Sequence, residues 1–241
     1  MVEISFGHET RCRPPVTGVI CELTADSCPQ RHSSGKDRLE VPDPPLLAAR
    51  YNVAPSQQIP VVGLRPDGVR CGVALLKWGL VASWANDPAR GPKPINARAE
   101  SVDHKFGEQF RDKRCLILTD GFYEWALIGG KKRANLFTLA DGTPFAFAGL
   151  WDTWRADGQR PLVTICMVTT TANDVVRPVH DRMPVILPTE CYAEWLDPAT
   201  PVKRLLVLLK PYPAELMTAR EVGSAVNSPR NDGPECLSVA S

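Results

Sequence analysis

Short apolar segments separated by turn residues recur along most of this chain, and that spacing is the strongest constraint on its fold. The segment 162–169, rich in Val, Ile and Thr, has the most strand-like composition. Two further pairs of such segments flank turns that contain Asp and Gly, namely 59–64 with 70–78 and 136–139 with 145–150. Each pair predicts a β-hairpin. The pattern indicates an α+β fold, a single domain with a mostly antiparallel, barrel-like sheet and short flanking helices.

Helical spacing is weaker and confined to short stretches. We predict helical structure within 96–111 and short helices at 173–179 and 188–196, where Thr189 suits an N-cap position. The segment 202–209 fits either a helix or a strand, because its periodicity favours neither.

The first 48 residues differ from the rest of the chain. Residues 1–48 carry scattered Pro, Ser, Cys and charged residues with little periodicity, and 17–23 is their one strand candidate. We therefore expect a weakly structured N-terminal segment. The domain is expected to span 49–237, followed by a short tail at 238–241.

Composition excludes several classes of protein. The 241 residues carry 28 Lys+Arg and 27 Asp+Glu, so any affinity for nucleic acid must come from local clusters of basic residues. The eight cysteines are irregularly spaced and form no C-x-x-C pair, which argues against a zinc site or a dense disulfide framework. We also find no apolar stretch of bilayer length and no secretory signal, and so expect a cytoplasmic protein with no membrane partner.

Three polar side chains stand out as candidates for chemistry. Asn96 and Arg98 are one residue apart, so on an extended segment they would face the same side. Glu124 lies between two aromatic residues, which would partly desolvate its carboxyl, raise its pKa and suit it to acid–base work. His180 stands in a dense motif with Asp181 and Arg182, and imidazole exchanges protons readily near neutral pH.

Each of these candidates has a structural alternative. Asn96 to Glu100 also reads as a capped helix start, Glu124 as a carboxylate paired with an arginine at the end of a sheet, and His180 as a structural histidine. Trp78 and Trp84 lie near several basic residues and suit the stacking of unpaired bases. Their alternative is a buried pair beneath a charged surface. The nearby basic residues are Arg90, Lys93, Arg98, Lys105, Arg111, Lys113 and Arg114.

Taken together and in this order, short motifs along 49–237 form a specific combination. The chain resembles the SOS-response-associated peptidase (SRAP) family. The motifs are Arg50-Tyr51-Asn52-Val53-Ala54-Pro55, Trp78-Gly79-Leu80, Asn96-Ala97-Arg98-Ala99-Glu100, Asp120-Gly121-Phe122-Tyr123-Glu124-Trp125, His180-Asp181-Arg182-Met183-Pro184 and Val226-Asn227-Ser228-Pro229-Arg230-Asn231-Asp232.

The resemblance implies a monomeric protein, without metal or cofactor, that binds single-stranded DNA containing abasic sites. It implies covalent capture of the ring-opened sugar by an N-terminal cysteine, and an autoproteolytic or peptidase ancestry. Asn96 would orient the reacting groups, Glu124 would shuttle a proton, and His180 would stabilise the opened sugar or shuttle a proton. The DNA-binding residues would be Arg98 and Arg182 on phosphates, Trp78 on a base, and Trp84, Arg50 and Asn52 beside them.

One departure from the family pattern concerns the nucleophile. The resemblance implies Met-Cys-Gly-Arg at the start, whereas this chain reads Met1-Val2-Glu3-Ile4. A mis-assigned start, a degenerate member that binds the strand without crosslinking, and processing that exposes an internal cysteine all remain open. A third function, amide hydrolysis by Glu124 and His180, lacks an evident Ser or Cys partner.

Overall fold

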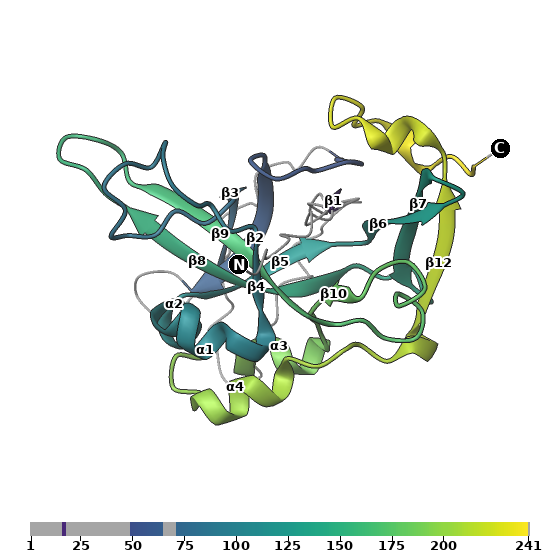
Figure 1. Ribbon diagram of the computed structural model, residues 1–241. Coiled ribbons are helices and arrows are strands. Elements are labelled where there is room, and N and C mark those ends of the chain that lie inside the picture. Colours follow the sequence, from purple (N-terminus) through teal and green to yellow (C-terminus); the bar gives the residue numbers. More distant parts are fainter. Residues whose placement is uncertain (1–15, 18–48, 65–70, 241) are drawn as a thin grey trace, which may run out of the picture.

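The computed structural model describes residues 16–17, 49–64 and 71–240, which form two β-sheets flanked by short helices (Figure 1). Most of the described strands pair antiparallel. The fold is α+β, as the alternation of apolar segments and turns predicts.

Five strands close into a barrel. They are β2 (Gln58–Leu64), β3 (Cys71–Trp78), β5 (Arg114–Thr119), β8 (Phe145–Trp154) and β9 (Leu162–Thr171). The ring runs β9–β3–β2–β5–β8 and returns to β9, because β9 pairs with both β3 and β8. Only the β3–β9 pair within this ring is parallel. Closure leaves these strands without a free edge, and it confirms the barrel-like prediction.

Three short strands extend the barrel. β4 (Asn96–Arg98) continues the path of β3 along one side of β9, and β10 (Arg182–Pro184) pairs with the other side of β9. β11 (Ile186–Leu187) pairs with β8. The C-terminal end of β9 is therefore flanked by two segments that are about 85 residues apart in the chain.

The second sheet has the order β1–β6–β7–β12 and is antiparallel throughout. Its strands are β1 (Val16–Thr17), β6 (Phe122–Ile128), β7 (Lys131–Leu139) and β12 (Met217–Val222). β6 begins just after Gly121, where an added Cβ would lie 2.9 Å from Leu136 Cδ1 and 3.1 Å from the Phe137 oxygen. Glycine is needed there because β7 approaches so closely.

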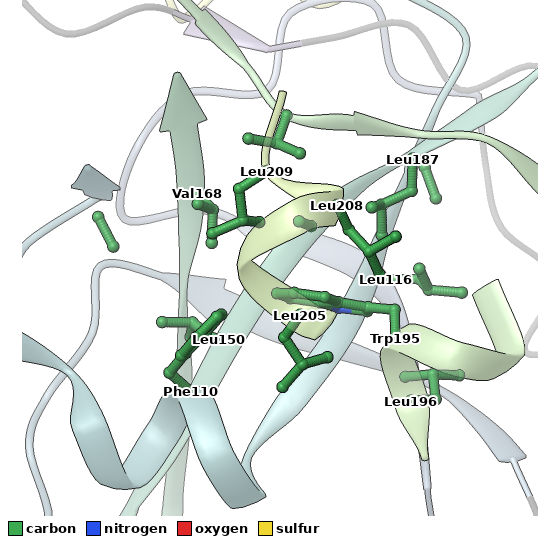
Figure 2. Packing of buried hydrophobic residues seen from close by; sticks show 14 of the residues in the cluster. Phe110, Leu116, Leu150, Val168, Leu187, Trp195, Leu196, Leu205, Leu208 and Leu209 are labelled. Atoms are coloured by element: carbon green, nitrogen blue, oxygen red, sulfur yellow. The ribbon is translucent and has the colours of Figure 1, made fainter. Parts of the chain in front are cut away.

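Short helices cover one face of the barrel sheet (Figure 2). Phe110, Trp195 and Leu205 are fully buried against strand residues, and the Phe110 and Trp195 rings lie 6.0 Å apart. The α-helices are α1 (Val102–Lys105), α2 (Gly107–Asp112), α3 (Tyr192–Leu196) and α4 (Val202–Leu208). The 3₁₀ turns are η2 (Ala99–Ser101), η3 (Thr189–Cys191), η4 (Ala214–Leu216), η5 (Ser224–Asn227) and η6 (Pro234–Leu237).

Aromatic packing joins the second sheet to the barrel. The ring of Phe122 on β6 stacks on Phe137 at 5.1 Å between centroids and meets the edge of Phe147 on β8 at 5.9 Å. All three side chains are fully buried. One face of β6 therefore points toward the barrel, and alternate residues of β6 point the other way.

Three predictions of local structure need correction. Segments 136–139 and 145–150 do not form a hairpin, because β7 pairs with β6 and β12 whereas β8 pairs with β5, β9 and β11. The turn between them is real, with Gly142 at φ 72°, but the chain crosses from one sheet to the other. Residues 173–179 form hydrogen-bonded turns instead of a helix. Thr189 is not an N-cap, since Pro188 takes that position.

The remaining predictions fared better. The β2–β3 hairpin is confirmed, although its turn at 65–70 lies outside the described residues. The ambiguous segment 202–209 contains helix α4. Of the strand candidate 17–23, only Thr17 is described. Within the expected tail, Val239 forms an antiparallel bridge with Val222.

Candidate functional site

β4 presents Asn96 and Arg98 on one side of an extended segment. They pair in register with Met167 and Thr169 of β9, while Ala97 between them is buried on the opposite face. The extended interpretation is thus confirmed over the capped-helix alternative for these two residues. The Oδ1 atom of Asn96 is buried and has no hydrogen-bond partner, and Arg98 is exposed without an ion pair to any described residue. A buried acceptor without a partner is costly unless a ligand supplies a donor.

Arg182 fastens the loop that carries His180 to the segment following β4. Its guanidinium donates to both carboxylate oxygens of Glu100, at 2.6 and 2.9 Å, and to the Thr169 oxygen at 2.7 Å. Because the pair is bidentate and the Arg182 side chain is 19% exposed, this contact is directional as well as charged. It holds the two polar motifs on either side of β9.

Three groups surround one ring nitrogen of His180. The Arg182 N–H donates to His180 Nδ1 at 3.0 Å, while the Arg182 oxygen and Asp181 Oδ1 lie 3.1 and 3.3 Å from the same nitrogen. In the tautomer in which Nδ1 accepts from the Arg182 N–H, Nε2 carries the proton and can act as a donor. His180 is half-buried and suits stabilising a developing negative oxygen.

Glu124 is a buried carboxyl without a partner. It is 3% exposed and makes neither a hydrogen bond nor an ion pair with any described residue. Burial, and secondarily the negative charge of Asp181, raises the pKa of Glu124 to about 8. The alternative of a Glu paired with an arginine is therefore wrong for the described chain.

The effect of the Asp181 charge on the pKa of Glu124 also indicates which segments lie near each other. Asp181 lies next to His180, so the 180–182 segment is within electrostatic range of Glu124. The same segment contacts Glu100, just beyond Asn96 and Arg98, through Arg182. The loop at 180–182 thus connects the surroundings of all three candidate catalytic residues.

The two tryptophans have opposite environments. Trp78 is fully buried and its Nε1 donates to the Ile95 oxygen at 2.8 Å, so the prediction that it contacts a base is wrong for this structure. Trp84 is 78% exposed. Its neighbours are anchored to β8, since Ser83 N donates to Asp152 Oδ2 and Trp154 Nε1 donates to the Ala85 oxygen. Trp84 is therefore a fixed aromatic surface.

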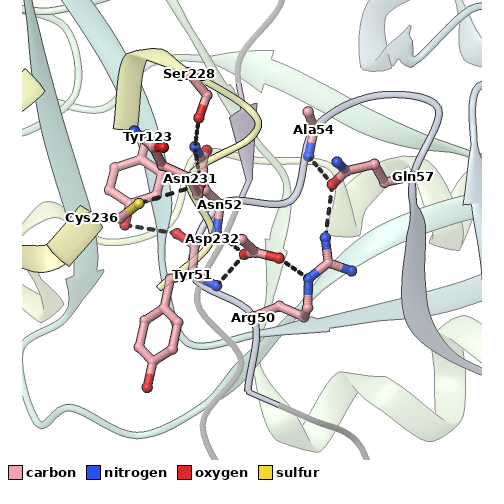
Figure 3. Close-up of polar contacts among 10 residues, drawn as sticks. All are labelled: Arg50, Tyr51, Asn52, Ala54, Gln57, Tyr123, Ser228, Asn231, Asp232 and Cys236. Carbon is pink, nitrogen blue, oxygen red and sulfur yellow. Dashed lines mark hydrogen bonds and ion pairs between the residues drawn. The ribbon is translucent and has the colours of Figure 1, made fainter. Parts of the chain in front are cut away.

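Arg50 and Asn52 belong to a structural contact that we call the clasp, formed by residues 50–52 and 226–232 (Figure 3). The fully buried Asn52 donates through Nδ2 to the oxygens of Val226, Ser228 and Asn231, at 3.0 to 3.1 Å. Asp232 accepts from the Arg50 side chain and from the backbone N–H groups of Tyr51 and Asn52. The predicted DNA contact of Asn52 does not fit this burial, and Arg50 is already paired.

Several other basic residues also serve the fold. Arg114 is buried and donates to the oxygens of Phe110, Trp195 and Asp197. Lys113 bonds Asp152 and Glu108. Arg182 is committed to Glu100, so its predicted phosphate contact is unsupported. Of the predicted phosphate-binding arginines, Arg98 alone is unpaired within the described residues.

Sequence reasoning did not assign a role to several residues whose hydrogen bonds hold the segments next to the candidate site. Tyr123 O–H donates to the Tyr51 oxygen at 3.0 Å, and Trp125 Nε1 donates to Asn227 Oδ1 at 2.7 Å. Asp152, fully buried at the base of the Trp84 loop, was also missed. The motifs at 50–52 and 226–232 stand out in the sequence. Because about 180 residues separate them, local pattern does not show that they contact each other.

No described helix has the length and apolar character required to cross a bilayer. Over the same described residues, no three His, Cys, Asp or Glu side chains come together as a potential metal site.

The structure combines three features. They are a closed barrel, a second sheet that carries a buried glutamate, and a histidine loop that is paired through Arg182 with the segment after the Asn-x-Arg strand. The family model described as SOS response associated peptidase (SRAP) matches residues 21–229. The chain belongs to this family.

Its relatives include bacterial and vertebrate proteins. The abasic site processing protein YoqW of Bacillus subtilis is 43% identical over 191 residues, covering 78% of this chain and 84% of that protein. The abasic site processing protein HMCES of Gallus gallus is 32% identical over 220 residues, covering 78% of this chain and 65% of its own length.

Solved structures share the fold. A protein from Bacteroides thetaiotaomicron superposes with a TM-score of 0.72 at 27% identity, covering 79% of this chain and 85% of that one. One from Bordetella bronchiseptica gives 0.63 at 28% identity, covering 72% and 87%.

Proposed function

We propose that this protein binds single-stranded DNA at abasic sites, opens the abasic sugar to its aldehyde form and captures that aldehyde covalently. The observation that carries the proposal is Glu124, a buried carboxyl with no partner among the described residues and a pKa of about 8. Such a group is mostly protonated at pH 7 and loses its proton without a large change in pH, as a proton shuttle requires. The names of the relatives supply the substrate, since they are abasic site processing proteins.

Ring opening needs only proton transfers and one bond cleavage. The protonated Glu124 gives its proton to the ring oxygen as the bond between that oxygen and C1 breaks, and the resulting carboxylate takes the proton of the C1 hydroxyl. The products are an aldehyde and a free hydroxyl, and Glu124 ends protonated as it began. His180 Nε2–H stabilises negative charge on the sugar oxygens. The buried Oδ1 of Asn96 accepts a hydrogen bond from the sugar or the attacking amine.

Strand binding rests on exposed groups near these residues. Arg98 is unpaired within the described chain and Trp84 is 78% exposed. A guanidinium can hold a phosphate while an indole stacks on an unpaired base. With a formal net charge of only +1, the protein must derive its affinity from such local contacts.

A second candidate is strand binding and sugar opening without covalent capture. The free cysteines whose side chains are described favour it, because Cys115, Cys166 and Cys236 are buried, Cys191 is partly buried, and burial raises the pKa of each of these thiols. A protonated, buried thiol is a poor nucleophile.

The test measures aldehyde release directly. Abasic single-stranded DNA is mixed with the protein and an alkoxyamine probe that reacts only with the open aldehyde, and the labelled strand is quantified over time. We expect the wild-type chain to speed labelling and Glu124→Gln, which keeps the shape but cannot shuttle a proton, to lose that effect while still binding DNA. Equal labelling rates for wild type, Glu124→Gln and DNA alone would reject the proposal. A denaturing gel of the same samples separates the two candidates, because only covalent capture shifts the strand.

A further inference from the structure

Glu124 lies on a strand whose two adjacent side chains are both anchored to the clasp. Since side chains alternate along β6, Tyr123 and Trp125 point away from the face that carries Phe122 and Glu124. Tyr123 packs instead with Leu136, Val222 and Cys236, in a cluster separate from the one that contains Phe122.

Tyr123 is held by a single well-defined hydrogen bond. Its side chain is fully buried, and its hydroxyl donates to the Tyr51 oxygen at 3.0 Å. Burial raises the pKa of Tyr123 well above its usual range, so the hydroxyl keeps the proton that it donates. The same residue of the clasp, Tyr51, is fixed through its N–H, which donates to Asp232 Oδ1 at 2.7 Å.

Trp125 is held by the other half of the clasp. Its Nε1 donates to Asn227 Oδ1 at 2.7 Å. Asn227 lies between Val226 and Ser228, whose oxygens both accept from Asn52 Nδ2. The two neighbours of Glu124 therefore attach to the two segments of the clasp. Tyr123 bonds to residue 51 (Figure 3), and Trp125 bonds to residue 227.

We propose that Tyr123 and Trp125 are positioning residues for Glu124, and that the clasp centred on Asp232 and Asn52 is the support that fixes them. The inference rests on the proposed function in that Glu124 is taken as the proton shuttle. With β6 anchored through Tyr123 and Trp125 on one face, the Glu124 carboxyl on the other face is held in one position and is kept from contact with water. Loosening that support displaces the carboxyl and hydrates it, even though neither aromatic residue touches the DNA.

The experiment compares Tyr123→Phe and Trp125→Phe, which remove one donor each and keep an aromatic ring, with Tyr192→Phe as a matched control. Tyr192 is also buried, at 5% exposure, but it packs in the core cluster under the short helices, with Trp195 and Leu205, and not in the cluster that contains Tyr123. Two readouts are taken on the full chain. One is the titration of the Glu124 carboxyl by ¹³C NMR, with its signal assigned by its absence in Glu124→Gln. The other is aldehyde release at saturating abasic DNA, together with the Kd for that DNA.

Tyr123→Phe and Trp125→Phe should each shift the Glu124 titration toward lower pH and slow aldehyde release, by on the order of tenfold for Tyr123→Phe, with an unchanged Kd. Tyr192→Phe should titrate and react like the wild type. A Glu124 titration unchanged in both clasp-facing variants would overturn the inference, and so would an equal shift in the Tyr192 control. The titration does not depend on turnover, so failure of the proposed function, seen as aldehyde release that is insensitive to Glu124→Gln, stays distinguishable from failure of the positioning role.

Discussion

Two buried carboxyl groups of this protein have opposite surroundings. Asp152 on β8 is fully buried and accepts hydrogen bonds from Gln109, Lys113 and the N–H groups of Ser83 and Thr153. Burial alone would raise the pKa of Asp152, but these donors together lower it. Glu124 on β6 is equally hidden and receives no donor from the described residues, so burial raises its pKa to about 8.

The difference separates a side chain that stabilises the fold from one that is available for chemistry. The same contrast recurs in other residue types. Arg182 is paired with Glu100 and Thr169, whereas Arg98 has no ion pair among the described residues. Trp78 is buried, whereas Trp84 is exposed. In each pair the free member is the one expected to meet DNA.

The largest expected effect comes from breaking the saturated carboxylate. Asp152→Ala would leave the buried Gln109 amide and the N–H groups of Ser83 and Thr153 without their acceptor, at a cost of about 3 to 5 kcal/mol in the free energy of unfolding. Lys113 would keep only its bond to Glu108. Urea unfolding measures this loss. Asp174→Ala, which removes a carboxylate whose side chain is 81% exposed, serves as the control and should change stability by less than about 1 kcal/mol. A small cost at Asp152 would mean that its donors find water instead.

Glu124→Gln should have the opposite sign and depend on pH. Between the ordinary carboxyl pKa near 4.5 and the folded value of about 8, the folded state holds a proton that the unfolded state has lost. Wild-type stability therefore falls as pH rises through this window, by about 3 to 5 kcal/mol from this group. Glu124→Gln has no such proton and should be more stable than the wild type at pH 8 to 9, with little difference near pH 5. Thermal unfolding at both pH values checks this, and parallel curves for the two proteins would show that the carboxyl is hydrated.

The fold was predictable where local pattern and long-range pairing agree. Residues 65–70 connect two strands that pair with each other, so the prediction of the β2–β3 hairpin was confirmed. The turn at 140–144 looks equally suitable, yet it connects two sheets. Residues 145–150 are all buried, and an apolar run of this kind pairs wherever the barrel needs a strand. Sequence alone does not say which partner that is.

The site was only partly predictable for a related reason. Motif content identified Asn96, Glu124 and His180, but not whether a neighbouring side chain faces the solvent or the core. Trp78 and Trp84 are six residues apart in similar surroundings along the chain, and the positive φ of Gly79 helps to turn the chain between them. Asn52 resembles a binding residue in the sequence, and only the return of residues 226–231 to its side makes it structural.

Trp84→Ala tests the exposed member of the tryptophan pair. Loss of stacking should weaken binding of abasic single-stranded DNA by about 1 to 3 kcal/mol. The free energy of unfolding should change by no more than about 0.5 kcal/mol, because the side chain is exposed. Fluorescence anisotropy gives the affinity. Trp84→Phe keeps an aromatic face and should retain most of it, whereas equal losses in both variants would assign Trp84 a role other than stacking.

The smallest expected effect separates Arg98 from Arg182. Arg98→Ala removes an unpaired charge, so DNA affinity should fall by roughly threefold to tenfold and the slope of log K against log salt should decrease by about one. Arg98→Lys keeps the charge and should keep the slope. Arg182→Ala should lower stability instead, because Glu100 then loses the partner that holds its pKa below the usual range. Binding titrations over a series of salt concentrations measure both slopes. An unchanged slope in Arg98→Ala together with a reduced slope in Arg182→Ala would contradict this prediction. It would mean that the Arg182–Glu100 ion pair opens on DNA and that Arg182 contacts the phosphate.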